Sequence, residues 1–449
     1  MARDLRGSGL RVVVLESGGL KPDPRTQALY RGAIVGKEYA PLDAARLRFF
    51  GGTTNHWNGR CRPLDPIDLE VREGVPGSGW PISYEELLRW YPGAQEICQL
   101  GPFTYSPEDW SELGRLLPLD ASRVITKIFQ LSPPTRFGEV YLEDLADAEN
   151  VEVYLRANVV DIEPVARPKV RVATLAGTSF TASSSALVLC CGGVENARLL
   201  LSGRGGQGIG GDAVGRYFME HLHFNNPTVL VPSDQEALEL YLPRGKDSGS
   251  ARSALVIAND VVRREGLLRF SGVLAPNLER TEADFSRMSS VVRSVHRRET
   301  SPVALVVEAE QSPNPDSRVR LTRHRDALGV PRVALDWRLR KRDLRSIRES
   351  LAIVGEALGA AGVGRLHTGI ADPPPQTGGV FHHMGTTRMG TDRSTSVVDP
   401  DGLVHETDAI YVAGSSTFPT GGFANPTLTI VALSLRLSRH LRRKLGANA

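Results

Sequence analysis

The residues Ala409-Ile-Tyr-Val-Ala-Gly-Ser-Ser-Thr-Phe-Pro-Thr-Gly-Gly-Phe-Ala-Asn-Pro-Thr-Leu-Thr429 combine three structural signals in one stretch. Ala409–Ala413 is a short apolar run, typical of a buried parallel strand. Gly414-Ser415 predicts a tight turn after this strand, and Pro426 predicts the first position of a long helix, because proline is favoured there. The succession of strand, glycine turn and helix indicates an α/β domain.

The same pattern occurs in the N-terminal half. Ala186–Cys191 predicts a buried strand, and Val194–Ser202 predicts a helix that begins directly after Gly192-Gly193. Arg11–Leu15 and Val151–Val160 predict two further strands. We therefore expect a Rossmann-like α/β domain assembled from distant parts of the chain.

The middle of the chain has a different pattern. Short runs rich in Val and Leu are separated by turn residues, which favours an antiparallel sheet. These runs are Pro227–Pro232, Ser253–Ala258, Pro302–Gln311, Val319–Leu321 and Val333–Arg338. Helical spacing of apolar residues predicts a helix over Lys341–Leu358, and the proline-rich residues 371–376 predict a stiff linker. An inserted α+β domain is the resulting expectation.

Bulk composition excludes several classes of protein. The chain has 449 residues, enough for two domains, and its 41% apolar and 23% charged residues are ordinary for a globular protein. A net charge of +3 favours neither nucleic acid nor an anionic membrane as a partner. No signal peptide and no run of eighteen apolar residues occur, so we expect a cytoplasmic protein without a membrane span.

The four cysteines are Cys61, Cys98, Cys190 and Cys191. They lack the spacing of metal ligands, so we expect reduced thiols and no metal. The adjacent pair lies in an apolar run, which predicts a place in a buried strand.

Two features concern a nucleotide. Glu16 ends the first predicted strand and precedes Gly18-Gly19; such a carboxylate binds the ribose in dinucleotide folds, but a solvated surface residue gives the same pattern. One literal Gly-x-Gly-x-x-Gly occurs at Gly203, Gly205 and Gly208. It follows a helix, whereas phosphate binding needs glycines between a strand and a helix N-terminus. We interpret it as a flexible loop.

Two further motifs permit comparison with a known family. They are Phe381-His-His-Met-Gly-Thr-Thr-Arg-Met-Gly390 and Phe49-Phe-Gly-Gly-Thr-Thr-Asn-His-Trp-Asn-Gly-Arg-Cys-Arg-Pro-Leu64. Together with Val12–Gly19, Leu187–Leu201, Val214–His223 and the stretch quoted first, they resemble the glucose–methanol–choline oxidoreductase family, in family order over almost the whole chain. Among its branches, the sugar-oxidising one that includes pyranose oxidase is most similar in motif.

The resemblance implies a fold and a domain division. We expect an FAD-binding Rossmann-like domain from residues 1–70, 145–224 and 375–449. Residues 71–144 and 225–374 would form the inserted substrate domain on its antiparallel sheet.

The resemblance also implies a catalytic pair. In that family a C-terminal His and a second His or Asn face the flavin, and matching the motifs gives His382 and Asn425, which are 43 residues apart. His382 would be the general base that takes the hydroxyl proton of an alcohol, since an imidazole is suited to this. Asn425 would hydrogen-bond the developing alkoxide. Without the motif, His382 and His383 would be ordinary loop histidines, and we expect a structural role for His383.

The cofactor that the resemblance implies is FAD. Glycines 51 and 52 would allow close approach of the backbone, and the predicted helix N-terminus would stabilise negative charge on the flavin. His56 corresponds to a segment in which pyranose oxidases attach FAD covalently, whereas related bacterial sequences hold FAD there without a bond, so both modes are open. The implied cofactor residues are Glu16, Gly51, Gly52, Asn55, His56, Asn158, Val159, Cys191, Gly192, Gly414, Ser415, Pro426 and Thr427.

In the family, a strand and its glycine loop precede the helix whose last turn resembles residues 2–9. Without them, two neighbouring strands would keep unpaired backbone groups and the phosphate cradle would be missing. We therefore expect the natural protein to start further upstream. An intact mass of 48.8 kDa with bound FAD would contradict this expectation.

The predicted function is FAD-dependent oxidation of an alcohol group in a sugar, glycoside, aminosugar or cyclitol. Two alternatives stay open on the same scaffold, a non-redox lyase and an inactive relic without FAD. The expected partner is a small carbohydrate-like molecule. The electron acceptor is open between oxygen, a quinone and a cytochrome subunit.

Overall fold

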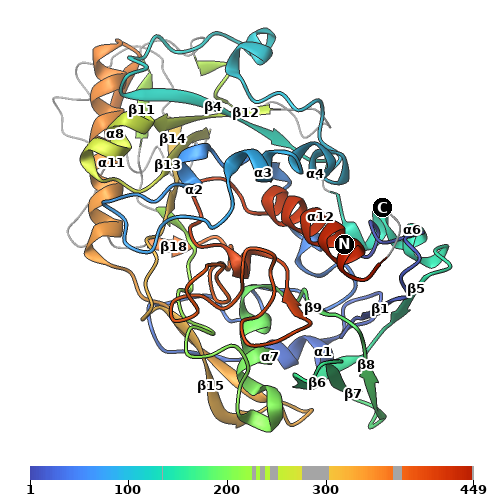
Figure 1. Ribbon diagram of the computed structural model, residues 1–449. Helices are drawn as coiled ribbons and strands as arrows, with labels where there is room; N and C mark the ends of the chain where they lie inside the picture. The colour runs from blue at the N-terminus through green and yellow to red at the C-terminus, as the bar shows by residue number, and fades with distance from the viewer. Residues whose placement is uncertain are drawn as a thin grey trace.

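The computed structural model describes residues 1–133, 135–224, 229–232, 238–242, 251–275, 303–367 and 377–446, with the backbone alone at 229–232, 367 and 377. Figure 1 shows a large sheet at one end of the molecule and smaller α/β and β elements at the other. Helix α12 (Thr427–Lys444) lies between the two ends and packs against α4 (Tyr91–Ile97). The predicted α/β fold with a large antiparallel sheet is confirmed.

Among the described residues the large sheet has nine strands, and their pairings are all antiparallel. Helix α11 (Lys341–Ala360), with α8 (Asn259–Glu265) beside it in Figure 1, covers one face, and the other face turns toward the rest of the molecule. Because both faces are covered, β12 is almost continuously buried. The strands are β3 (Arg60–Cys61), β4 (Val124–Leu131), β10 (His221–Phe224), β11 (Val229–Pro232), β12 (Ala251–Ile257), β13 (Phe270–Ala275), β14 (Val303–Glu310), β17 (Gly364–His367) and β18 (Thr377–Gly379).

The prediction of one antiparallel sheet from five runs was wrong for two of them. β15 (Arg318–Arg325) and β16 (Pro331–Asp336) form a separate sheet with β2 (Ala33–Ile34), next to helix α7 (Gly192–Gly206). Their hairpin has the same local pattern as the other runs, and only the distant partner β2 distinguishes it. The predicted helix Lys341–Leu358 is confirmed, while the predicted linker 371–376 lies outside the described residues.

The predicted parallel strands form two pairs. β1 (Val12–Leu15) pairs with β5 (Val151–Tyr154), and β9 (Leu187–Leu189) pairs with β19 (Ile410–Val412). Within the described ranges, the two pairs are not hydrogen-bonded to each other.

The single strand predicted over Val151–Val160 is wrong. Arg156 has a φ of 57°, so the chain turns there into β6 (Asn158–Glu163). β6 belongs to a small antiparallel sheet with β7 (Lys169–Ala173) and β8 (Ser179–Ser183).

Helix boundaries agree closely with the glycine and proline signals. α7 begins at Gly192, and its backbone leaves helical geometry at Gly203–Gly205, which confirms that the Gly-x-Gly-x-x-Gly motif follows a helix. α12 begins one residue later than predicted, with Pro426 as its N-cap. The shorter helices are α1 (Pro24–Gln27), α2 (Pro66–Leu69), α3 (Tyr84–Leu88), α5 (Phe137–Val140), α6 (Leu142–Ala146), η1 (Ala28–Tyr30), η2 (Gly52–Asn55), η3 (Pro107–Leu113) and η5 (Ser415–Thr417).

One continuous hydrophobic core joins both ends of the molecule. It includes Leu255 of the large sheet, Leu200 of α7, Leu428 of α12 and Ile410 of β19. The strands also cross the expected domain bounds, since β10 and β18 join the large sheet. The domain division therefore stays a prediction, and a shared core fixes the two ends relative to each other.

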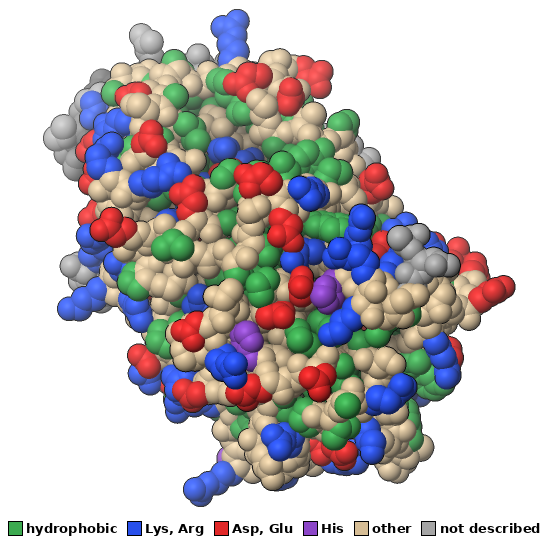
Figure 2. Space-filling view, in the orientation of Figure 1, with side chains coloured by type: hydrophobic (Ala, Val, Ile, Leu, Met, Phe, Trp, Pro, Cys, Tyr) green, Lys and Arg blue, Asp and Glu red, His purple; other side chains and the backbone are tan. Residues whose placement is uncertain are grey.

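The surface shows no dominant charge. Basic and acidic side chains are interspersed on the face seen in Figure 2, as the small net charge suggests. None of the helices that the structure describes is long and apolar enough to cross a bilayer. Cys61 and Cys98 are buried, whereas Cys190 and Cys191 are exposed just beyond β9, so the prediction that this pair lies within a buried strand was wrong.

Candidate active site

His382 is brought to the large sheet by a bulge beside strand β10. Leu222 pairs with Gly379, and Met219 pairs with Met384. Between these two pairs the chain advances by three residues on the β10 side and by five residues on the other side. The extra residues are accommodated at Phe381, whose φ is 66°. The bulge places His382 against the first residue of β10, with 2.8 Å between Nδ1 of His221 and Nδ1 of His382.

Glu220 holds this bulge from inside the protein. Its fully buried carboxylate accepts hydrogen bonds from the backbone N–H groups of His382 at 2.9 Å and Val380 at 3.3 Å. The Tyr39 hydroxyl makes a short hydrogen bond to the same carboxylate and lies 2.9 Å from Nε2 of His383. His383 thus has buried packing and hydrogen-bonding contacts, and its structural role stays a prediction.

Burial dominates the electrostatics of this cluster. It raises the pKa of Glu220 to about 7, against the hydrogen bonds from Tyr39 and the bulge, which lower it. It also lowers the pKa of His383 to about 3, with Arg46 as a further cause. His383 is therefore neutral at neutral pH, and Glu220 is partly protonated.

Asn425 faces His382 from the loop before α12. Its Nδ2 lies 3.4 Å from Nε2 of His382, so the structure brings the two predicted catalytic residues together. Arg60 on β3 donates from Nε to Oδ1 of Asn425 at 2.7 Å. Because a guanidinium can only donate, this bond fixes which end of the amide points at His382.

Burial also governs the protonation of His382. Burial lowers its pKa well below the usual value, and His221, Arg60 and His383 lower it further. The imidazole is therefore neutral at neutral pH and has one nitrogen lone pair available for a proton.

The sheet next to this pair presents polar side chains. Arg60 forms an ion pair with Glu308 and stacks over the Phe129 ring at 4.9 Å. Burial, together with the charge of Arg60, lowers the pKa of Arg252 on β12 to about 10, while the charge of Glu308 raises it. His223 Nδ1 and Arg252 Nε are buried without a hydrogen-bond partner among the described residues.

Two surface hollows lie away from this pair. One, of about 300 Å³, lies between α7 and β15, and the other, of about 570 Å³, lies between α3 and α12.

The predicted cofactor residues lie in several places, of which the first is the end of β1. One carboxylate oxygen of Glu16 accepts from the Gly18 N–H at 2.6 Å. Asn158 is buried and accepts from Arg48 at 3.2 Å, while Val159 is half-buried. Asn158 therefore contributes hydrogen bonds within the protein.

The second place is at the ends of the adjacent strands β9 and β19. Gly192 and Gly414 have φ values of 81° and 110°, and a side chain added at either would meet no other protein atom within 4 Å. Cys191 is accessible to solvent, although the protein around it desolvates its thiol and raises the pKa to about 12. Buried Asn196 joins the two turns by accepting from Cys191 N–H and donating to the Ala413 carbonyl and the Ser416 hydroxyl. Ser415 donates to the His383 carbonyl at 2.7 Å.

The third place is the segment around Gly51. A Cβ on Gly51 would lie 2.6 Å from the Gly138 backbone, so this glycine is required for packing, whereas Gly52 meets only the Leu47 carbonyl, at 4.0 Å. Asn55 donates to two carbonyls of its own loop. His56 is exposed. Thr427 is half-buried at the first turn of α12.

Sequence reasoning missed the residues that orient the pair. Glu220 and His221 lie in Val214–His223, which had been matched to the family without assigning roles. Arg60 lies in the quoted stretch 49–64 but follows the glycine-rich part. Buried charged or polar residues inside a matched motif were the signal that could have found them.

The chain is similar to several known proteins. Residues 313–434 match the family model described as GMC oxidoreductase. The chain is 40% identical to 6'''-hydroxyparomomycin C oxidase of Streptomyces lividus over 139 residues, which are 30% of this chain and 24% of that protein. It is 42% identical to pyranose 2-oxidase of Tricholoma matsutake over 67 residues, 15% of this chain and 12% of that protein.

A crystal structure of formate oxidase has a similar fold, with a TM-score of 0.60, 15% identity and coverage of 99% of this chain and 95% of that chain. The chain is thus similar in its C-terminal sequence to the GMC oxidoreductase family and in its overall fold to formate oxidase. The alignments span about a quarter or less of the two curated relatives, 24% and 12%. The match to this family model indicates FAD as the cofactor.

The residues present fit such a cofactor. The turns at Gly192 and Gly414 expose backbone to open space at the carboxyl ends of parallel strands, where nucleotides bind in α/β folds. Cys191, which is accessible just beyond β9, indicates the same open space.

Proposed function

We propose that this protein is a GMC oxidoreductase that carries out FAD-dependent oxidation of an alcohol group of a carbohydrate-like molecule, with His382 as the base. The observation that supports this most directly is the oriented pair of His382 Nε2 and Asn425 Nδ2, 3.4 Å apart. Glu16, Gly192, Gly414 and Thr427 are the residues that would hold FAD, together with the other cofactor residues predicted from the sequence.

The chemistry requires two bonds to break at the alcohol. His382 takes the hydroxyl proton at Nε2, and the C–H bond releases a hydride as the carbonyl forms. FAD, when bound, supplies the acceptor for this hydride. Asn425 donates to the oxygen as negative charge develops on it, and Arg60 keeps the amide in the donating orientation.

The substrate class is supported by the polar wall of the site. Arg60, Arg252, His223 and Glu308 offer donors and an acceptor to a molecule with several hydroxyl groups. The two curated relatives are named as oxidases of an aminoglycoside and of a pyranose. We propose a sugar, glycoside, aminosugar or cyclitol.

The test is anaerobic bleaching of the flavin in the natively produced protein. Glucose, a methyl glucoside, paromamine and myo-inositol would be added separately, and at least one is expected to bleach the flavin absorbance. His382→Gln is expected to slow bleaching about 100-fold or more, because a general base typically contributes 10²- to 10⁴-fold. His405→Gln is the control, since the His405 imidazole is hydrogen-bonded to Ser396 and is not part of the His382–Asn425 pair. Flavin that stays oxidised while product forms would replace this proposal with a lyase reaction.

A further inference from the structure

One peptide unit beside the site is held at both ends. The Gly421 carbonyl lies 3.2 Å from Nε2 of His221, and the N–H of the next residue, Gly422, donates to Oε1 of Glu310 at 3.4 Å. Glu310 therefore fixes the orientation of this peptide through its N–H group, and the peptide carbonyl points at the His221 ring.

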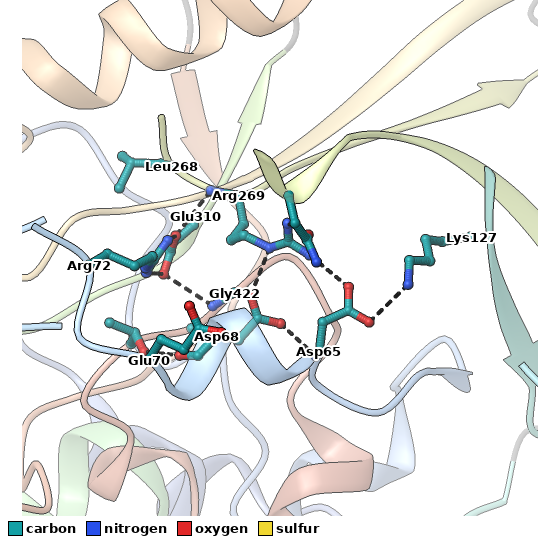
Figure 3. A network of polar contacts seen from close by, with 12 residues as sticks. Asp65, Asp68, Glu70, Arg72, Lys127, Leu268, Arg269, Glu310 and Gly422 are labelled. Atoms are coloured by element: carbon teal, nitrogen blue, oxygen red, sulfur yellow. Dashed lines mark hydrogen bonds and ion pairs between the residues drawn. The ribbon is translucent and has the colours of Figure 1, made fainter. Parts of the chain in front are cut away.

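Glu310 is itself fixed by a buried network, which Figure 3 shows. Arg72 donates to both carboxylate oxygens, at 2.8 and 2.6 Å, and the Arg269 backbone N–H donates at 3.0 Å. The Arg269 side chain extends the network to Asp68 and Asp65 on the far side of Gly422. A buried network in which each charge is paired is rigid, so it keeps Glu310 in one position.

The carbonyl of Gly421 dictates the protonation of His221. A carbonyl only accepts, so Nε2 of His221 carries a proton and donates to it. A neutral imidazole has one N–H, which leaves a lone pair on Nδ1 of His221. That lone pair faces Nδ1 of His382 at 2.8 Å, so Nδ1 of His382 must supply the proton of this hydrogen bond.

The opposite end of His382 gives the same answer independently. Arg60 fixes the amide of Asn425 so that its Nδ2 donor points at Nε2 of His382. Two N–H groups cannot share one hydrogen bond, so Nε2 of His382 carries the lone pair.

We propose that His221 is the positioning residue of this enzyme: it fixes the proton of His382 on Nδ1 and keeps the basic lone pair on Nε2, toward the substrate. The tautomer stands on the hydrogen bonds alone, while its catalytic consequence rests on the proposed function. When Nε2 takes a proton, Nδ1–H of His382 continues to donate to His221, and the charge of the imidazolium is shared with a prepared acceptor.

The first test reads the tautomers without any substrate. In FAD-containing protein labelled with ¹⁵N-histidine, long-range ¹H–¹⁵N spectra distinguish a protonated ring nitrogen from a bare one. We expect His382 to be protonated at Nδ1 and His221 at Nε2, with the signals assigned by their loss in His382→Gln and His221→Asn. A His382 protonated at Nε2 in the wild-type protein would overturn the proposal.

The second test uses a matched pair of variants. His221→Asn keeps an oxygen acceptor near the place of Nδ1, whereas His221→Leu keeps the bulk and removes the acceptor. We expect His221→Leu to lower the limiting rate of flavin bleaching about 100-fold with the apparent Kd unchanged, using the panel compound that bleaches wild-type protein fastest. The limiting rate of His221→Asn should be at least 10-fold higher than that of His221→Leu.

Equal losses in the two variants, or a loss confined to the Kd, would overturn the positioning role. The expected ¹⁵N pattern together with a flavin that no compound bleaches would instead leave the tautomer standing and refute the proposed oxidation. If His221→Leu does not fold, the wild-type spectrum still decides the question.

Discussion

The pair His382 and Asn425 depends on side chains from other elements. Glu220 fixes the backbone of His382, and Arg60 fixes the amide of Asn425. These two contacts come from β3 and from the residue before β10, so the large sheet orients a pair that the C-terminal loops carry.

Arg60→Lys tests the orientation of Asn425. Lysine keeps the positive charge near Glu308 but lacks the planar guanidinium, which contacts Glu308 and donates to Asn425 at the same time. Loss of a hydrogen bond from a charged donor costs about 1.5 to 3 kcal/mol, so we expect the rate of flavin bleaching to fall about 10- to 100-fold. Arg123→Lys, at the exposed ion pair with Glu356, is the matched control and should change the rate by less than about 2-fold. A rate unaffected by Arg60→Lys would contradict the role of Arg60.

Glu220 and His383 should have opposite effects on stability as pH changes. The pKa of Glu220 is raised from 4.5 to about 7, so the folded state holds the extra proton and stability falls as pH rises between these values. The pKa of His383 is lowered from 6.5 to about 3, so the unfolded state holds the extra proton and stability rises with pH between these values. The two contributions oppose each other where their windows overlap.

Single variants would separate these contributions. Between pH 4.5 and 6.5, relative to wild type, Glu220→Gln should make the slope of unfolding free energy against pH more positive by about 1.4 kcal/mol per unit. His383→Gln should make the slope more negative by a similar amount. Urea unfolding at several pH values measures both, and slopes that change in the same direction would refute the assignment.

At this scale the sequence predicted which two residues would lie together but not the residues that support them. His382 and Asn425 lie in motifs that resemble a known family, and the structure places them side by side. Arg60 and His221 act through a hydrogen bond to one residue that is 365 positions away and another that is 161 positions away. No local pattern encodes such pairings.

Among the elements, the loop before α12 has a strict backbone requirement at Gly422. Gly422 has a φ of 57°, and a Cβ there would lie 2.9 Å from Cγ of Asp68. Because Asp68 is held by Arg269, the carboxylate cannot move away freely.

Gly422→Ala should therefore destabilise the protein and disturb the site. A strained left-handed alanine costs about 1 to 3 kcal/mol, and the contact with Asp68 adds to this cost. Gly329→Ala is a matched control, since Gly329 has a φ of 79° with no atom within 4 Å of the added carbon. Thermal unfolding should show the larger loss for Gly422→Ala, and only this variant should slow flavin bleaching. Equal losses of thermal stability in the two variants would mean that backbone strain, and not the contact with Asp68, causes the destabilisation.

Element types were largely predictable, and their pairings were not. The apolar runs gave β1, β9 and β19, and the proline and glycine signals gave the starts of α7 and α12. The assignment of β15 and β16 failed because a hairpin of Val and Leu fits either sheet, and only contact with β2 decides between them. Long-range pairing is a property of the whole chain rather than of a window.

For the whole molecule, the distribution of hydrogen bonds is uneven. The large sheet has nine interconnected strands, whereas β1–β5 and β9–β19 are two-stranded pairs in the described part of the chain. Two-stranded units have little stability of their own. The proposed FAD residues Glu16, Gly192 and Gly414 lie at the ends of these pairs, so the cofactor would contact the weaker part of the fold.

Removal of FAD should therefore loosen the molecule unevenly. A ligand at 100 times its Kd stabilises the state that binds it by about 2.7 kcal/mol, which corresponds to about 100-fold in hydrogen exchange. We expect exchange in FAD-free protein to accelerate toward this limit in β1, β9 and β19 and to change little in β12–β14. Gly414→Val, whose side chain would enter the open space at that turn, should show the FAD-free pattern even with FAD added. Gly362→Val is the control, because its φ of 68° and open surroundings are comparable but it follows α11. Uniform acceleration over both ends would mean that the shared core transmits cofactor binding to the whole fold.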